Sequence, residues 1–306
     1  MTDKYAVIGN PISHSKSPQI HAAFAKQTNQ DMTYEAILAP LDGFKNTLNR
    51  LIAESYKGVN VTVPFKFEAC DCVAPIRTPN GIVEKQPINT ISIRQDAEFE
   101  YARDTVFGAN TDGIGLLRDV TQNLGTDIAG KRVLLLGAGG AAQGVLHPLL
   151  EKMPASFVIV NRSADKAKSL VEQAEKVRLY EKAPISLLKL LVQGVKFTAR
   201  YQAVEIVACS FEQLHNQQAF DVVINATSAG LTDATLPIPD SVFAPNCLAY
   251  DMMYGRETPF MRQAKEAGTT VADGLGMLVE QAAEAFYIWR GVRPITKPVI
   301  EMLRRG

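Results

Sequence analysis

A run of apolar residues followed by a cluster of glycines, near the middle of the chain, constrains the fold more than any other segment. Residues 133–136 read Val-Leu-Leu-Leu, and an apolar run without polar alternation is typical of a strand buried on both faces of a parallel sheet. Residues 137–144 read Gly-Ala-Gly-Gly-Ala-Ala-Gln-Gly and lead into small and apolar residues that can form a helix. Strand, glycine turn and helix in this order predict a dinucleotide-binding βαβ unit. The alternative interpretation is a structural turn that binds nothing.

The small residues of this turn each have a physical role in such a unit. Gly137 makes the tight turn, Gly139 lets the backbone approach a pyrophosphate, and Ala142 lets helix and strand pack closely. The helix start then offers unpaired N–H groups and a partial positive charge to phosphates.

The next predicted strand distinguishes between the two nicotinamide cofactors. Residues 157–160 are Phe-Val-Ile-Val, and the strand ends at Asn161 and Arg162. A site selective for NAD carries an acidic residue near this point, which binds the ribose 2′-hydroxyl. Here Arg162, and Lys166 one helical turn later, supply cations instead. Two cations favour a 2′-phosphate, and therefore NADP.

The composition limits the class of protein. A chain of 306 residues exceeds the usual size of one hydrophobic core, so we expect two domains. Lys plus Arg and Asp plus Glu both number 32, which argues against nucleic acid or a membrane as the main partner. No uncharged apolar run reaches about 18 residues, so a membrane-spanning helix is not expected. The N-terminus enters a strand pattern directly, which argues against a signal peptide. The four cysteines lack the spacing of metal ligands. We therefore expect a cytoplasmic protein without a metal site.

Three other places carry polar groups that can act on a ligand. Ser15 and Ser17 can present two hydroxyls to a carboxylate, or can form a turn and cap the helix that starts at Pro18. Lys66 lies just after a strand of β-branched residues and is flanked by two Phe residues. It is either a partly desolvated acid–base group or an ordinary solvated lysine. Asp112 precedes a helical pattern. Its side chain either serves only as the cap of that helix, or caps the helix and also takes part in the reaction.

Strand and helix patterns alternate along the chain, which predicts an α/β protein with parallel sheets. Glycine residues lie within or next to polar loops at 110–113 and 274–276, and we expect hinges between domains there. Between 178 and 220 the pattern is the least clear, with a short helix predicted over 184–191. A hairpin is predicted over 95–107.

Several of these motifs, taken in order, resemble those of the shikimate dehydrogenase family. The resemblance spans nearly the whole chain, and the ordered co-occurrence is more specific than any single motif. The matching segments are 9–12, 14–18, 60–66, 88–90, 110–113, 137–141, 161–162, 225–228, 250–252 and 272–279.

The resemblance implies two α/β domains. A smaller substrate-binding and catalytic domain with a mainly parallel sheet would comprise residues 1–112 and 274–306. Between its two parts, residues 113–273 would form a Rossmann-type NADP-binding domain with a doubly wound parallel sheet. The chemistry would take place where the two domains meet.

The resemblance also implies an activity, the NADPH-dependent and reversible reduction of 3-dehydroshikimate to shikimate, a step of chorismate and aromatic amino acid biosynthesis. The enzyme would be a monomer or homodimer. Lys66 and Asp112 would form the catalytic pair, and Asn89 would position one of them. Ser15, Ser17 and Tyr254 would bind the substrate carboxylate, and Thr62, Asn89 and Gln281 its hydroxyls. The cofactor residues would be Gly137, Gly139, Gly140, Ala141, Asn161, Arg162, Lys166, Thr227, Met252 and Gly274.

The chain departs from the family pattern at Gln143, where many relatives carry arginine, at Lys166, where some relatives do, and in additional sequence over 181–202. The nearest alternative is a quinate/shikimate dehydrogenase with a broader range of substrates or cofactors. A folate-type dehydrogenase would share only the cofactor domain, and the N-terminal motifs count against it. A silent dinucleotide-binding regulator would have lost Lys66 or Asp112, and both are present.

Overall fold

The computed structural model describes residues 2–73, 86–94, 106–181 and 204–305, with only the backbone described over 176–181. It divides into two compact units. The first unit contains both ends of the chain, Met1–Gly115 and Leu278–Gly306, and the second is Leu116–Met277. The sequence predicts domain boundaries at 112/113 and 273/274.

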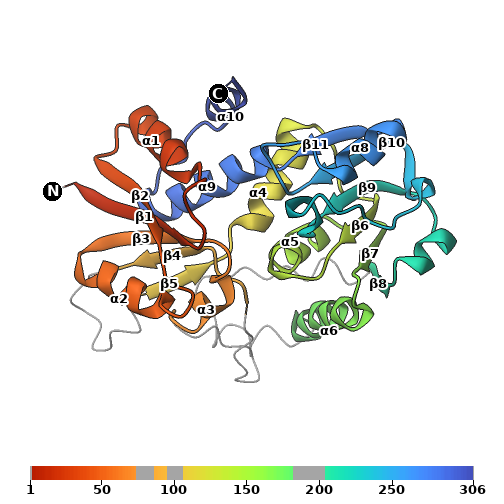
Figure 1. Cartoon of the computed structure of the whole chain (residues 1–306), viewed down its shortest axis with the longest axis horizontal. Coiled ribbons are helices and arrows are strands. Elements are labelled where there is room, and N and C mark those ends of the chain that lie inside the picture. The colour runs from red at the N-terminus through yellow and green to blue at the C-terminus, as the bar shows by residue number, and fades with distance from the viewer. Residues whose placement is uncertain (1, 74–85, 95–105, 182–203, 306) are drawn as a thin grey trace. The chain divides into compact units, whose positions relative to one another are not determined.

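The first unit is built on a five-stranded sheet in the order β2-β1-β3-β4-β5 (Figure 1). Strand β1 pairs in parallel with β2 and β3, β4 is antiparallel to β3, and β5 is antiparallel to β4. Only β4 therefore opposes the common direction, which confirms the predicted, mainly parallel sheet. The strands are β1 (Asp3–Gly9), β2 (Met32–Leu38), β3 (Tyr56–Val61), β4 (Thr90–Ile93) and β5 (Val106–Ala109).

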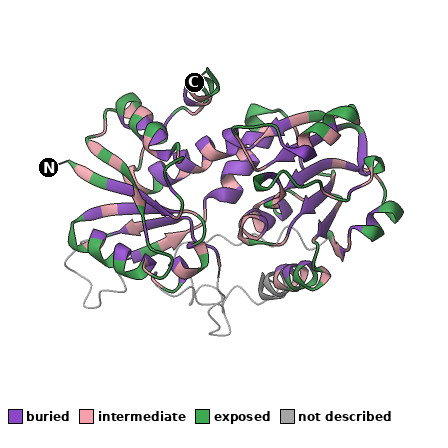
Figure 2. Ribbon diagram, viewed as in Figure 1, coloured by how far each residue is buried: buried purple, intermediate pink, exposed green. Residues whose placement is uncertain are grey.

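Helices cover both faces of this sheet. The apolar sides of α2 (Phe44–Ala53) and α3 (Lys66–Cys70) pack with Ile8 and other buried strand residues on one face. A second apolar cluster joins α1 (Ser17–Thr28), α9 (Leu275–Arg290) and α10 (Lys297–Arg305). Figure 2 shows the resulting buried strands between helices whose outer sides are exposed.

The start of α1 differs from the expectation. Ser17, predicted to cap the helix, is its first residue, and Lys16 occupies the cap position without a side-chain hydrogen bond. The Ser17 hydroxyl is therefore not used by the cap. Pro18 stands in the first turn, where its missing N–H costs no hydrogen bond.

The second unit contains a six-stranded sheet in the order β11-β10-β9-β6-β7-β8, with every pairing parallel. β6 is the first of these strands in the sequence, so the order in space is that of a Rossmann sheet. Ligands of such sheets bind outside the carboxyl ends of the strands, at the place where the strand order reverses. Here the reversal lies between β6 and β9. The strands are β6 (Arg132–Leu136), β7 (Ser156–Val160), β8 (Glu205–Cys209), β9 (Phe220–Asn225), β10 (Phe243–Asp251) and β11 (Thr270–Asp273).

Strand β6 is buried on both faces, as predicted. Val133 and Leu135 join one apolar cluster, and Leu134 and Leu136 join the other. The first cluster includes α5 (Gly140–Leu150) and α6 (Ala164–Glu181), while α8 (Pro259–Glu266) contributes to the second. The sheet is thus doubly wound. The remaining elements are α4 (Asp112–Arg118), the π-helix η2 (Asp119–Asn123), and the 3₁₀ turns η3 (Glu212–Asn216), η4 (Ala229–Leu231) and η5 (Asp240–Val242).

The predicted helix over 184–191 and most of the predicted hairpin and of the additional segment lie outside the described residues. Among the residues that the structure describes, no helix is long and apolar enough to span a membrane. The same residues contain no cluster of metal-ligating side chains.

Candidate active site

Lys66 and Asp112 form an ion pair in the first unit. The Lys66 Nζ lies 2.6 Å from Asp112 Oδ2, and the two side chains are 19% and 8% exposed. Lys66 is the first residue of α3, and Asp112 the first of α4. The buried ring of Phe65 fixes the turn before Lys66, and the Ile88 amide donates to the Lys66 carbonyl oxygen at 2.8 Å. The two predicted catalytic residues are therefore in direct contact.

Asn89 holds the other oxygen of the Asp112 carboxylate. Its Nδ2 donates to Asp112 Oδ1 at 2.7 Å and lies 3.4 Å from Gln281 Oε1. Its Oδ1 accepts from the Thr111 amide at 2.8 Å, which fixes the orientation of the Asn89 amide. Four of the predicted residues, Lys66, Asn89, Asp112 and Gln281, thus form one connected cluster.

The topology explains why segments distant in sequence meet at one edge of the sheet. The loop with Ser15 and Ser17 follows β1, and Lys66 follows β3, so both leave the carboxyl ends of parallel strands. Asn89 immediately precedes the antiparallel strand β4, and Asp112 follows β5. Since β4 runs in the opposite direction, its beginning lies at the same edge as the ends of the others.

Of the remaining predicted substrate residues, three belong to the first unit and one belongs to the second. The Ser17 amide donates to Ser15 Oγ at 3.3 Å, so the two serines form one turn. Thr62 directly follows β3, and its amide donates to the Ile8 carbonyl oxygen at 3.0 Å. Tyr254 belongs to the second unit, where burial raises the pKa of its phenol.

The sequence reasoning missed three buried polar residues of the cluster. Asn60 and Thr90 lie on β3 and β4, and Thr111 precedes Asp112, with exposed fractions of 5%, 1% and 1%. Each is hydrogen-bonded to Asn89. Polar residues inside apolar strands were the available signal, because burying them costs free energy unless they are paired.

The glycine turn of the second unit has the geometry that a dinucleotide needs. Gly137 has φ +110°, and a Cβ there would lie 3.0 Å from the Ala226 carbonyl oxygen. A Cβ at Gly139, directly before α5, would meet no neighbouring atom within 4 Å, so the surroundings of this glycine are open. Gly140 and Ala141 begin α5, and the first N–H groups of a helix have no partner within it. The turn therefore fits a phosphate group.

The end of β7 supplies the predicted cations. Arg162 and Lys166 are exposed, and Asn161 Nδ2 donates to the Ser163 carbonyl oxygen at 3.1 Å. Lys166 also borders a small pocket of about 120 Å³, next to a hydrogen bond of 2.8 Å between Gln143 and Gln173. The Gln143 side chain thus donates a hydrogen bond to the uncharged side chain of Gln173. The pocket is lined by Ala138, Gln143, Lys166, Ser169, Leu170 and Gln173.

Hydrogen bonds fix the loops after β9, β10 and β11. Asn225 Oδ1 accepts from Thr227 Oγ1 at 2.7 Å, and its Nδ2 donates to Asp251 Oδ2 at 3.1 Å. Burial raises the pKa of Asp251, although hydrogen bonds from Thr258, Met253 and Asn225 act in the opposite direction. The Met252 amide donates to the Asn225 carbonyl oxygen at 3.0 Å. A Cβ at Gly274 would lie 2.3 Å from the Met252 carbonyl oxygen, so only glycine fits there.

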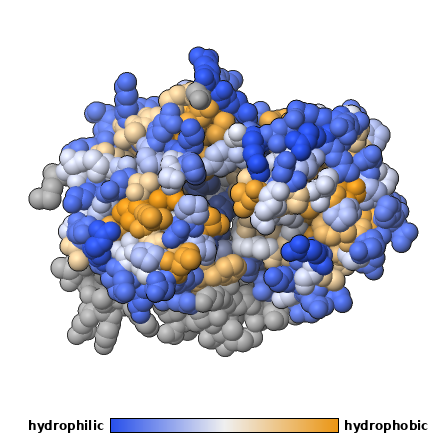
Figure 3. Space-filling view, in the orientation of Figure 1, coloured by the Kyte–Doolittle hydropathy of each residue, from blue (hydrophilic) through white to orange (hydrophobic). Residues whose placement is uncertain are grey.

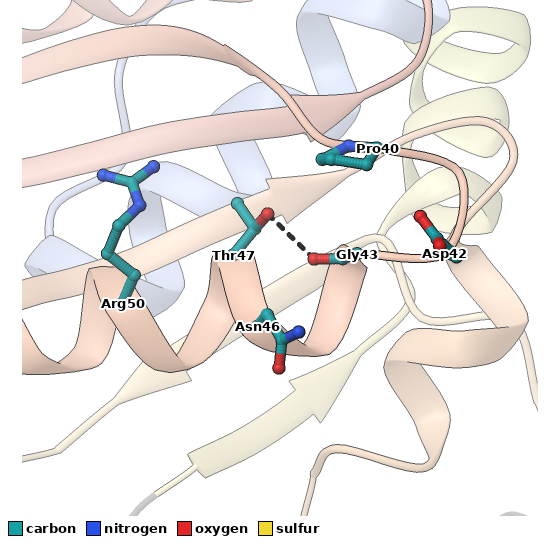
Figure 4. Close-up of a pocket in the computed structure, with 6 residues that line it drawn as sticks. All are labelled: Pro40, Asp42, Gly43, Asn46, Thr47 and Arg50. Atoms are coloured by element: carbon teal, nitrogen blue, oxygen red, sulfur yellow. Dashed lines mark hydrogen bonds between the residues drawn. The ribbon is translucent and has the colours of Figure 1, made fainter.

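Another pocket lies elsewhere in the first unit. It measures about 360 Å³ and lies at the beginning of α2, where Thr47 Oγ1 donates to the Gly43 carbonyl oxygen at 2.9 Å (Figure 4). None of its lining residues was predicted to act in the site. Leu38 and Leu41, which precede this helix, are among the exposed apolar residues. Figure 3 shows hydrophobic residues among hydrophilic ones on the surface. The pocket is lined by Pro40, Asp42, Gly43, Asn46, Thr47 and Arg50.

A Rossmann-type unit with a phosphate-binding glycine turn, together with a unit that carries a lysine–aspartate pair, defines a dinucleotide-dependent oxidoreductase of the α/β class. The chain belongs to the shikimate dehydrogenase family. Three family models match it: shikimate dehydrogenase substrate binding domain over residues 7–81, shikimate/quinate 5-dehydrogenase over 119–195, and shikimate 5′-dehydrogenase C-terminal domain over 274–304.

Individual relatives cover the full length of the chain. A shikimate dehydrogenase (NADP(+)) of Methylobacillus flagellatus is 52% identical over 303 residues, which are 99% of each chain. The crystal structure of an Ael1 enzyme from Pseudomonas putida has a TM-score of 0.80 at 39% identity, covering 99% of this chain and 98% of that one. The shikimate 5-dehydrogenase from Thermus thermophilus in complex with NADP(H) and shikimate has a TM-score of 0.74 at 27% identity, covering 99% of each chain.

Proposed function

We propose that the protein catalyses the reversible, NADP-dependent interconversion of 3-dehydroshikimate and shikimate. The observation that carries this proposal is the cluster of Lys66, Asp112 and Asn89, with its short ion pair, in a chain 52% identical to a named NADP-dependent shikimate dehydrogenase. The proposal needs only the small substrate and the cofactor as partners. A cytoplasmic location and a monomeric or homodimeric state remain predictions from the sequence.

In the reducing direction, bound NADPH supplies a hydride to the ketone carbon. The carbonyl oxygen gains negative charge and must take up a proton, which the Lys66 ammonium provides while also stabilising that charge. Asp112 orients Lys66 through the 2.6 Å contact. In the oxidising direction the same pair accepts the proton of the substrate hydroxyl.

Most of the groups that we assign to the substrate lie at one edge of the first sheet, whereas Tyr254 belongs to the second unit. We assign the hydroxyls of Ser15 and Ser17 to the carboxylate, together with the Tyr254 phenol. Thr62, Asn89 and Gln281 would bind the ring hydroxyls. Support comes from the placement of the two serines after β1 and of Thr62 after the neighbouring strand β3.

The cofactor would bind at the carboxyl ends of the second sheet. We assign the pyrophosphate to the turn and helix start at Gly137, Gly139, Gly140 and Ala141. The 2′-phosphate would contact Asn161, Arg162 and Lys166, because two exposed cations suit a dianion. The nicotinamide side would be bordered by Thr227, Met252 and Gly274.

A steady-state assay of cofactor reduction tests the proposal. Shikimate should support the reduction of NADP⁺, and NAD⁺ should give a kcat/KM at least about tenfold lower, since each charge-assisted contact to the 2′-phosphate contributes on the order of 1.5–3 kcal/mol. No shikimate-dependent reduction of either cofactor would refute the activity. Equal efficiency with both would refute the assigned cofactor.

Quinate is the second candidate substrate, because the family model over 119–195 covers both shikimate and quinate dehydrogenases. Quinate has the same carboxylate but a saturated ring with an additional hydroxyl at the carbon that bears it. The same assay with quinate in place of shikimate distinguishes the two. Comparable kcat/KM values would assign the broader activity.

A further inference from the structure

A chain of hydrogen bonds leads from the catalytic cluster into the first unit through side chains that have no role in the proposed reaction. Thr90 Oγ1 lies 3.0 Å from Asn89 Oδ1, and Asn60 Nδ2 lies 3.1 Å from Thr90 Oγ1. The Tyr34 phenol ends the chain, with its oxygen 2.7 Å from Asn60 Oδ1. The chain crosses the sheet from β2 through β3 to β4, and reaches Asp112 through Asn89.

The partners of Asn60 fix the direction of the two bonds that Asn60 makes in this chain. Asn60 Nδ2 also lies 3.1 Å from the backbone carbonyl oxygen of Asn89, which can only accept. The Asn60 oxygen therefore faces Tyr34, and the phenol donates. Thr90 accepts from Asn60, and its hydroxyl oxygen lies 3.0 Å from Asn89 Oδ1 and 3.3 Å from Thr111 Oγ1. Asn89 Oδ1 also accepts from the Thr111 amide, so the Asn89 NH₂ faces Asp112.

The surroundings make these bonds hard to replace. Asn60, Asn89 and Thr90 are 5%, 3% and 1% exposed, so water has little access to their polar atoms. The Tyr34 ring stacks on the buried His21 ring, with centroids 4.1 Å apart and planes within 7°. Burial raises the pKa of the Tyr34 phenol well above its ordinary value, and the Ser17 hydroxyl partly opposes this by hydrogen bonding. The phenol therefore remains a donor at any working pH.

We propose that Tyr34 is a positioning residue for the Lys66–Asp112 pair, acting through Asn60, Thr90 and Asn89. The phenol touches no reacting group. It anchors one end of a directed chain whose other end presents the Asn89 NH₂ to the Asp112 carboxylate. Its contact with Ser17 also links this chain to the loop assigned to the substrate carboxylate. The kinetic consequence rests on the proposed function.

The substitution Tyr34→Phe tests the proposal, because it removes only the hydroxyl and retains the ring that stacks on His21. Tyr56→Phe is the matched control, since the Tyr56 phenol on β3 of the same sheet donates to Glu35, outside the chain. One readout is kcat and KM with shikimate and NADP⁺. The other is the rate at which an acylating reagent labels Lys66, followed by mass spectrometry with Lys45 as the internal reference. The second readout needs no activity.

We expect Tyr34→Phe to lower kcat roughly three- to tenfold, which corresponds to one net hydrogen bond, with KM for NADP⁺ unchanged. We also expect Lys66 to be labelled faster, by roughly twofold or more, because a less well-held Asp112 leaves the Lys66 amino group unpaired more often and so more open to the reagent. Tyr56→Phe should match the wild type in both readouts. Wild-type values for Tyr34→Phe in both would overturn the proposal.

Thr90→Val breaks a later link of the same chain and supplies a second test. If the residues act in one chain, the double variant Tyr34→Phe/Thr90→Val loses no more kcat than the more impaired of the two single variants. Losses that multiply would overturn the proposal. A wild-type protein inactive with shikimate would refute the proposed function alone, and the labelling rates would then decide the inference.

Discussion

At the scale of single residues, the chemistry depends on how a carboxylate is shared. Asp112 accepts from the Lys66 ammonium on one oxygen and from the Asn89 amide on the other, so its position is fixed from both sides. A buried carboxylate needs such partners, because burying a charge without hydrogen-bond partners costs free energy. The ammonium is the more exposed of the pair, 19% against 8%, and is therefore the group that a substrate can reach.

Replacement of Lys66 should remove most of the catalysis. We expect Lys66→Ala to lower kcat by about 10²–10⁴, the usual contribution of a positioned acid–base group, while the Kd for NADPH stays unchanged. Stopped assays and fluorescence titration with NADPH measure the two quantities. Lys45→Ala, at an exposed position of α2, is the control. Near-normal turnover in Lys66→Ala would contradict its assigned role.

Arg162 should determine the choice of cofactor. We expect Arg162→Ala to raise the KM for NADPH by roughly 10–100-fold and that for NADH little, because only NADPH carries the 2′-phosphate. Lys168→Ala, an exposed cation on α6, controls for the loss of positive charge. Equal changes for both cofactors would place the 2′-phosphate elsewhere.

At the scale of elements, the two glycines of the turn after β6 have different physical requirements. Gly137 has a positive φ and lies close to the Ala226 carbonyl, so a side chain there strains the turn itself. Gly139 has an ordinary φ of −89° and open surroundings, so a methyl group there occupies space without straining the fold. One glycine serves the fold, and the other leaves room for a ligand.

Alanine substitutions at these two positions should separate stability from cofactor binding. Gly137→Ala should lower the free energy of unfolding by about 1–3 kcal/mol, the cost of a strained backbone conformation. Gly139→Ala should leave the melting temperature unchanged and raise the KM for NADP⁺ roughly tenfold or more, because backbone can no longer approach the pyrophosphate. Thermal denaturation and steady-state kinetics measure the two effects. A stability loss in Gly139→Ala, with KM unchanged, would show that this glycine serves only the fold.

The same elements show what could be predicted from the sequence. The buried strand β6, the turn and helix that follow it, and the end of β7 just before Asn161 were predicted correctly, because each depends on a short local pattern. The chain from Tyr34 to Asn89 was missed, because it depends on the order of β2, β1 and β3 in the sheet and on the antiparallel pairing of β4, which no local pattern reveals. Ser17 was wrongly predicted to cap α1, since Lys16 already occupies that position.

At the scale of the whole molecule, an aromatic cluster ties the two ends of the chain into the first unit. His21 on α1 stacks on Tyr34 and lies 5.5 Å, between ring centroids, from Trp289 on α9. Burial lowers the pKa of His21 to about 3, and an interaction with Asn60 only partly opposes this. The folded first unit therefore requires a neutral histidine at its centre.

His21 should make the stability of this unit sensitive to acid. Below the ordinary pKa of 6.5, the unfolded chain binds a proton that the folded chain does not, so stability falls as the pH drops toward 3. At pH 5 the loss from this group is about 2 kcal/mol, at about 1.4 kcal/mol per pH unit. His21→Phe should reduce the difference in unfolding free energy between pH 7 and pH 5 by that amount. Trp289, the single tryptophan, reports the transition by its fluorescence.

An unchanged pH dependence in His21→Phe would show that this histidine is protonated in the folded protein.

The most direct test of the proposed activity follows the hydride itself. NADPH carrying deuterium at both C4 positions is incubated with the protein and 3-dehydroshikimate, and the product is analysed by mass spectrometry and NMR. We expect shikimate with one deuterium, at C3. Unlabelled shikimate, deuterium at another carbon, or no shikimate at all would contradict the proposed reaction.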